Sequence, residues 1–125
     1  EWEYAARGGA DTISYKYSGD SIPNNVAWFV GNSLQTTHIV AMKNPNQLGL
    51  YDMSGNVCEW CQDWYGNYEI SKQKDPQGPA NGSYKVYRGG SWYFDARYAS
   101  TPRPPQRRDI CVLRYLRPKV LSSSF

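Results

Sequence analysis

Cysteine is scarce in this sequence, with three residues among 125. An odd number excludes a framework in which every cysteine is paired within the chain. Cys58 and Cys61 have the spacing of a redox or zinc motif, and Cys111 with His38 formally completes a Cys3His zinc set. A single CxxC without a second paired motif is weak support for either chemistry. We therefore expect small cysteine side chains on a buried strand or turn.

Long apolar runs are absent as well. No run of about 18 apolar residues occurs, which excludes a transmembrane helix, and no charged-then-apolar leader opens the chain. The first seven residues favour a helix that ends at Gly8 and Gly9, and no Met precedes them. We interpret the sequence as part of a longer one. Its compartment is left open, with secretion and cell-surface display among the alternatives.

Acidic residues are sparse in the last third of the chain. Residues 88–125 contain eight Lys/Arg and two Asp/Glu, whereas residues 1–87 contain six Lys/Arg and nine Asp/Glu. A basic segment with interleaved Tyr could attract an acidic peptide, a sulfated glycan or nucleic acid. The alternative is a set of solvated arginines. Because no nucleic-acid-binding motif is present, we do not expect a nucleic-acid partner.

Aromatic residues and turn formers are abundant. Aromatics make up 15% of the chain, with five Trp and eleven Tyr, beside 11 Gly and 8 Pro. This composition predicts one loop-rich α+β domain in which large rings supply much of the buried area. Residues 11–50 keep no periodicity and are expected to be ordered coil. Alternation predicts strands at 84–88 and, in the basic tail, at 110–116.

Five motifs occur in one order along the chain. They are EWEYAARGG at 1–9, NVAWF at 25–29, THIV at 37–40, PNQLGLYDMSGNVCEWCQDWY at 45–65 and YRGGSW at 87–92. In order and spacing the chain resembles the sulfatase-modifying-factor family, to which the formylglycine-generating enzymes belong. The resemblance covers residues 1 to about 100. It implies a coil-rich C-type-lectin-like fold, of which residues 1–125 would be the C-terminal part, with the N-terminal part of the domain absent.

The resemblance also implies one structural calcium site. In the family a calcium is held at the positions of Asp52 and Glu59 through side chains, and at those of Gly55 and Val57 through carbonyls. The residue types agree, because calcium prefers oxygen ligands around a tight turn that glycine permits. The alternative is that Asp52 and Asn56 only organise a turn while Glu59 accepts backbone hydrogen bonds. The acidic loop that would complete the family's second calcium site is missing.

The family's oxidase chemistry lacks its ligands in this chain. Active members bind copper(I) through two cysteines, a choice that reflects the preference of copper(I) for soft thiolates. Counted from the Arg-Gly-Gly-Ser at 88–91, the corresponding positions hold Phe94 and Ala99. Cys58 instead replaces a Trp of the family's common motif. Copper and oxidase activity are therefore not expected, although formylglycine-generating oxidase remains the alternative function, together with a nonfunctional fragment of one.

Some family members are the variable proteins of diversity-generating retroelements, which mutate adenines in the 3′ coding region. Randomising an asparagine AAC codon at its first two bases never produces Trp, Met, Gln, Lys or Glu. Residues 1–92 contain 21 residues of these five types, whereas residues 93–118 contain one, Gln106. The depletion favours a diversified segment there. Neutral drift of surface positions is the alternative.

We therefore predict a non-catalytic binding module whose ligand is a protein or peptide. An acidic ligand is among the alternatives, because arginines can pair with carboxylates. Tyrosine provides contact area at a small loss of side-chain entropy, which suits a binding face. The predicted ligand-binding residues are Tyr87, Tyr93, Phe94, Asp95, Arg97, Tyr98 and Arg103.

Overall fold

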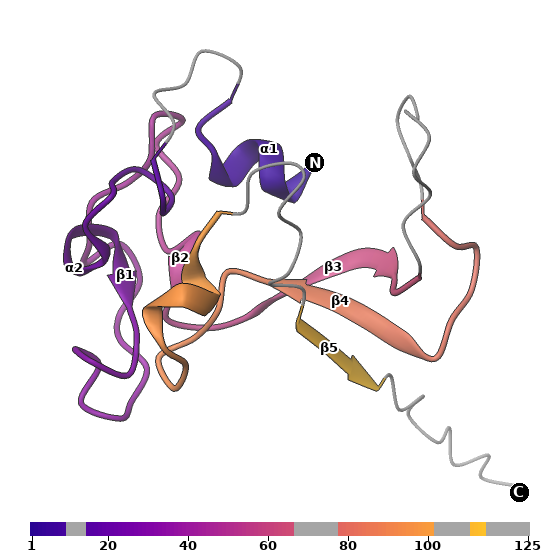
Figure 1. Cartoon of the computed structure of the whole chain (residues 1–125). Coiled ribbons are helices and arrows are strands. Elements are labelled where there is room, and N and C mark those ends of the chain that lie inside the picture. The colour runs from indigo at the N-terminus through magenta and orange to yellow at the C-terminus, as the bar shows by residue number, and fades with distance from the viewer. Residues whose placement is uncertain (10–14, 67–77, 102–110, 115–125) are drawn as a thin grey trace, which may run out of the picture.

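The computed structural model describes residues 1–9, 15–66, 78–101 and 111–114. Short helices and strands are separated by long ordered loops, as the composition predicts (Figure 1). In chain order the elements are α1 (Trp2–Ala6), α2 (Pro23–Val26), β1 (Ala27–Trp28), β2 (Ser54–Gly55), β3 (Glu59–Trp64), β4 (Tyr84–Arg88), the 3-10 helix η1 (Ala96–Ala99) and β5 (Cys111–Arg114).

Two small sheets organise the described residues. In the first, β1 pairs in parallel with β2, so that Ala27 lies opposite Ser54. In the second, the antiparallel strands lie in the order β3-β4-β5, with an irregularity in register between Trp60 and Trp64. The three-stranded sheet extends away from the loop-rich part that holds α2, β1, β2 and η1 (Figure 1).

The expected elements at both ends of the sequence are confirmed. The first helix forms and ends before Gly8 and Gly9, which have φ values of 82° and 93°. Positive φ suits glycine and stops a helix. The strand predicted at 84–88 is β4 with the same bounds, and the strand predicted at 110–116 is present as β5 over Cys111–Arg114.

The coil expected over 11–50 contains two elements that the sequence did not reveal, α2 and β1. A four-residue helix and a two-residue strand are too short to leave a periodic pattern. Pro23 lies in the first turn of α2, where a backbone N–H would have no partner inside the helix. The missing N–H of proline therefore costs the helix no hydrogen bond.

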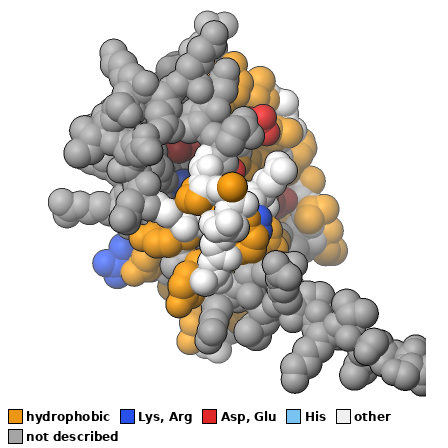
Figure 2. Space-filling model, turned by 90° about the vertical axis from the view of Figure 1, so that its right-hand side faces the viewer, with side chains coloured by type: hydrophobic (Ala, Val, Ile, Leu, Met, Phe, Trp, Pro, Cys, Tyr) orange, Lys and Arg blue, Asp and Glu red, His pale blue; other side chains and the backbone are white. Residues whose placement is uncertain are grey.

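The buried core differs from the expected one. Of the described residues with buried hydrophobic side chains, two are aromatic, Tyr17 and Tyr87, and the others are Ala, Val and Met. One cluster contains Tyr17, Val26 and Ala99, with Ala96 packed against it. None of the five tryptophans is fully buried, because Trp60 is exposed and the other four are half-buried. Hydrophobic side chains are also spread more widely than charged ones over the face in Figure 2.

Candidate functional site

The segment after β4 presents most of the predicted ligand-binding residues. Asp95 caps η1, accepting a hydrogen bond from the backbone N–H of Arg97 at 2.9 Å. The Ser100 hydroxyl donates to the Arg97 carbonyl at 2.7 Å at the other end of η1. These local bonds fix a short helical turn in which Arg97 and Tyr98 are exposed while Ala99 is buried. Tyr93 and Tyr98 are 67% and 39% exposed.

The rings of this segment contact one another in sequence. Trp92 packs edge-on against Tyr93 with centroids 5.5 Å apart, and Tyr93 packs in the same way against Phe94 at 6.0 Å. Phe94 is tilted against Tyr98 at 5.8 Å. Edge-to-face pairs are favourable and restrict ring motion. We call Tyr93, Phe94, Asp95, Arg97 and Tyr98 the ligand face.

The two charged side chains of the ligand face form one exposed ion pair. Arg97 Nε lies 3.4 Å from Asp95 Oδ1, and the two side chains are 71% and 54% exposed. The guanidinium also lies 5.5 Å from the centroid of the Tyr98 ring. An exposed pair of this kind contributes little to stability. Arg97 can therefore exchange Asp95 for a carboxylate of a ligand at small cost.

Two predicted ligand-binding residues lie elsewhere. Tyr87 is 8% exposed in β4 and packs edge-on against Trp60 with centroids 6.0 Å apart, so its ring is not presented to solvent. Arg103 lies outside the described residues. The structure thus brings together five of the seven predicted residues.

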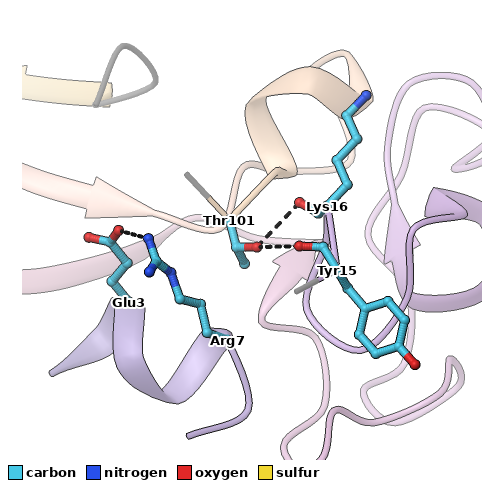
Figure 3. A network of polar contacts seen from close by, with 5 residues as sticks. All are labelled: Glu3, Arg7, Tyr15, Lys16 and Thr101. Carbon is cyan, nitrogen blue, oxygen red and sulfur yellow. Dashed lines mark hydrogen bonds and ion pairs between the residues drawn. The ribbon is translucent and has the colours of Figure 1, made fainter. Parts of the chain in front are cut away.

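Neighbouring loops hold the ligand-face segment by its main chain. Val30 N–H donates to the Phe94 carbonyl at 3.0 Å, and the Ser33 hydroxyl donates to the Trp92 carbonyl at 2.9 Å. The Thr101 N–H donates to the Lys16 carbonyl at 2.9 Å, with the Thr101 hydroxyl beside the same strip of chain (Figure 3). None of these bonds uses a side chain of residues 93–98. Sequence analysis missed Val30 and Ser33, whose partners are about 60 residues away.

The predicted calcium ligands lie on the turn around β2. Asp52, Gly55 and Asn56 all have positive φ, at 56°, 78° and 61°, which curls this stretch tightly. Asp52 Oδ2 accepts from Ala41 N–H at 2.8 Å, whereas Oδ1 is buried and has no hydrogen-bond partner. A buried carboxylate oxygen without a partner is costly unless a cation or another donor satisfies it.

The remaining predicted ligands differ in their surroundings. Glu59 Oε2 accepts a hydrogen bond from the indole N–H of Trp2, and Val57 is 48% exposed. Among the described residues, no group of three or more His, Cys, Asp or Glu side chains lies together. A cation here would therefore need main-chain carbonyls, which the predicted set provides at Gly55 and Val57. The donors present are compatible with a hard, oxygen-ligated cation.

Among the described side chains, Cys58, Cys61 and His38 do not form a group that could hold a metal ion. Cys58 precedes β3 and Cys61 lies within it, and both are half-buried thiols. Burial raises the pKa of the Cys61 thiol, although Arg88 acts in the opposite direction, and a protonated thiol is a weak nucleophile. His38 stacks on Trp28 with ring centroids 3.7 Å apart, and its Nε2 lies 2.8 Å from the Ser33 carbonyl, to which it donates.

The positions of the family's copper-binding cysteines lie within the ligand-face segment. Phe94 is half-buried among the aromatic rings, and Ala99 is 2% exposed in the core cluster. Neither side chain can coordinate copper.

Comparison with known proteins gives consistent results. The sulfatase-modifying factor enzyme 1-like domain family matches residues 1–111. The serine/threonine-protein kinase pkn1 of Chlamydia pneumoniae is 51% identical over 96 residues, which cover 74% of this chain and 15% of the kinase. The formylglycine-generating enzyme of Streptomyces coelicolor is 35% identical over 122 residues, covering 86% of this chain and 38% of the enzyme.

Among solved structures, Treponema denticola variable protein 1 matches with a TM-score of 0.77 and 40% identity, covering 91% of this chain and 40% of the variable protein. The chain thus spans well under half the length of these relatives. The expected coil-rich, C-type-lectin-like fold is confirmed. No described helix is long and apolar enough to cross a membrane. The chain belongs to the sulfatase-modifying factor enzyme 1-like domain family.

Proposed function

We propose that this chain is a non-catalytic module that binds a protein or peptide ligand through the ligand face. The observation that carries the proposal is the pair of solvent-exposed tyrosines, Tyr93 and Tyr98, on a segment held in place through its backbone. Rigid tyrosines give contact area with little loss of conformational entropy. Exposed Arg97 favours a ligand that carries carboxylates.

The same segment suits sequence diversification. Its anchoring bonds use the main-chain atoms of Trp92 and Phe94, so substitutions at 93, 95, 97 and 98 leave these bonds intact. The depletion of Trp, Met, Gln, Lys and Glu across 93–118 and the similarity to a variable protein support the same interpretation. A near-copy of the 84–118 coding region that differs at adenines, found beside a reverse transcriptase gene, would establish that this segment is diversified.

We further propose one structural calcium, held by Asp52 and Glu59 through side chains and by Gly55 and Val57 through carbonyls. The partnerless Asp52 Oδ1 supports this assignment. When bound, a calcium ion supplies positive charge and several coordination positions for oxygen ligands at this turn. Its role is structural.

The ligand face is tested by selecting peptides from a random phage-displayed library on the full chain. We expect the selected peptides to be rich in Asp and Glu and to lose at least about tenfold in affinity when Tyr93 and Tyr98 are both changed to Ala, because central aromatic anchors dominate binding energy. The matched control changes two exposed tyrosines outside the face, Tyr4→Ala and Tyr84→Ala. Circular dichroism checks that both variants are folded.

Two results would contradict the proposal. Equal affinity of the peptides for both double variants would remove the ligand face as the binding site. Formation of an aldehyde on a sulfatase-type cysteine peptide, with copper(I) and oxygen, would instead support the formylglycine-generating oxidase that several relatives' names indicate. Without a thiol at Phe94 or Ala99, we expect no aldehyde.

A further inference from the structure

Three hydrogen bonds join residues 54–56 to the segment that carries the ligand face. Gly55 N–H donates to the Gly89 carbonyl at 2.6 Å, and Trp92 N–H donates to the Asn56 carbonyl at 2.8 Å. The Ser54 hydroxyl donates to the Ala99 carbonyl at 2.8 Å. These bonds lie before and after residues 93–98. The placement of the ligand face therefore depends on the conformation of residues 54–56.

The proposed calcium ligands enclose the same three residues. Asp52 lies two residues before Ser54, and Glu59 lies three residues after Asn56. Two non-glycine residues here, Asp52 and Asn56, have positive φ, a conformation that L-residues adopt rarely and at some cost in energy. A cation held at both ends of the turn would favour this strained backbone over alternatives. Fixing the turn would fix residues 54–56 with it.

Ser54 provides the one side-chain link among the three bonds. Its side chain is completely buried, and its hydroxyl both accepts from Ser18 N–H at 3.0 Å and donates to the Ala99 carbonyl. Water cannot compete for a hydroxyl buried in this way, which strengthens the bond. Ala99 ends η1, so this bond fixes the end of the ligand face that is farther from β4.

We propose that Ser54 is a positioning residue through which calcium bound at 52–59 orders the ligand face without touching the ligand. The inference rests on the proposed calcium site and ligand face. Because binding linkage is reciprocal, a ligand that orders residues 92–99 tightens calcium binding by the same factor by which calcium tightens ligand binding.

Hydrogen–deuterium exchange of the full chain, with calcium alone as the probe, tests this coupling. Isothermal titration first gives the calcium dissociation constant. At a free calcium concentration ten times that constant, amides whose opening requires metal release should exchange about tenfold more slowly. We expect this slowing at Trp92 and at Ser100 and Thr101, which lie on either side of the ligand face.

Two matched variants locate the link. Ser54→Ala removes the hydroxyl that bonds Ala99. Thr101→Val removes a hydroxyl that donates to the Lys16 carbonyl at 3.2 Å, a bond that involves no residue of 52–59 (Figure 3). We expect Ser54→Ala to keep the calcium-dependent slowing at Trp92 and to lose it at Ser100 and Thr101. Thr101→Val should keep both. A merely structural contribution of Ser54 would lower protection equally with and without calcium.

The inference is overturned if calcium binds the wild-type chain without slowing exchange anywhere in 92–101, or if Ser54→Ala responds to calcium as the wild type does. Absence of calcium binding would overturn both this inference and the calcium proposal. In that case the Tyr93 and Tyr98 variants would still test the ligand face. Failure of the calcium proposal and failure of the ligand face are therefore distinguishable.

Discussion

Asn56 shows how much a single buried residue contributes in a fold with few regular elements. Its side chain is 2% exposed; its amide oxygen accepts from His38 N–H, and its amide nitrogen donates to the His38 carbonyl, both at 3.0 Å. The main-chain N–H of Asn56 donates to the Trp28 carbonyl, and the main-chain carbonyl of Asn56 accepts from Trp92 N–H, both at 2.8 Å. One asparagine thus joins β1 to the chain at His38 and at Trp92.

Gly55 allows the closest backbone approach in the same turn. It has a φ of 78°, and a Cβ at this position would clash with the Trp28 carbonyl oxygen. We expect Gly55→Ala to lower the free energy of unfolding by about 3 kcal/mol or more, because strain at positive φ and displacement of β1 both contribute. Urea denaturation monitored by tryptophan fluorescence measures the change.

Gly49→Ala is the matched control for Gly55→Ala. Gly49 has a φ of 74°, but a Cβ there would meet no atom within 4 Å. Only the strain of positive φ remains, which costs about 1 kcal/mol. Similar losses in the two variants would mean that the contact between β1 and β2 tolerates a methyl group and that its close approach does not matter.

Among the elements, α1 depends on contacts outside itself. A five-residue helix is not stable alone. Asn46 Nδ2 donates to the Ala5 carbonyl at 2.7 Å and to the Ser18 hydroxyl at 3.0 Å, and its Oδ1 accepts from the N–H groups of Leu48 and Leu50. The helix is therefore held to the loop at 46–50 by a buried amide.

Replacing Asn46 with Ala should release α1 from this loop. We expect a loss of about 1–3 kcal/mol in stability, because buried backbone groups are left without partners. Trypsin cleavage after Arg7, followed by mass spectrometry, should accelerate about tenfold or more. Asn44→Ala, in which an exposed asparagine of the same loop is changed, should leave cleavage unchanged. Equal cleavage rates in the two variants would show that Asn46 does not hold α1.

The elements also show what sequence could and could not predict. The helix at 1–7 and the strand at 84–88 were predicted because Gly8 and Gly9 mark a helix end and alternation marks a strand. The pairing of β1 with β2 was not predicted, because Ala27 and Ser54 are far apart in sequence and each strand has only two residues. Five of the predicted ligand-binding residues lie together because they fall within six positions of the sequence, and their role in binding stays a prediction. Tyr87 was included by proximity in sequence, but its side chain is buried in β4, where its ring packs against Trp60.

At the scale of the whole molecule, residues 52–59 connect its two sheets. They include β2 and the first residue of β3, and their hydrogen bonds reach Trp28 in β1 and the chain directly after β4. The buried hydrophobic side chains of the described residues are few and mostly small. A domain with so little apolar core is the kind that gains most from a bound metal.

Calcium should therefore raise the thermal stability of the whole chain. At a hundredfold excess over its dissociation constant, a ligand that binds only the folded state adds about 2.7 kcal/mol. For a domain of this size we expect an increase in Tm of roughly 10 °C relative to EGTA, measured by differential scanning calorimetry.

Asp52→Asn and Glu59→Gln should each remove most of the increase in Tm, because they delete ligand charge while keeping side-chain shape. Asp63→Asn, at an exposed position of β3, should retain it. Magnesium should substitute poorly, because it requires a small octahedral site. An unchanged Tm in calcium would mean that Asp52 and Asn56 only organise the turn, and that the buried Asp52 Oδ1 is tolerated without a cation.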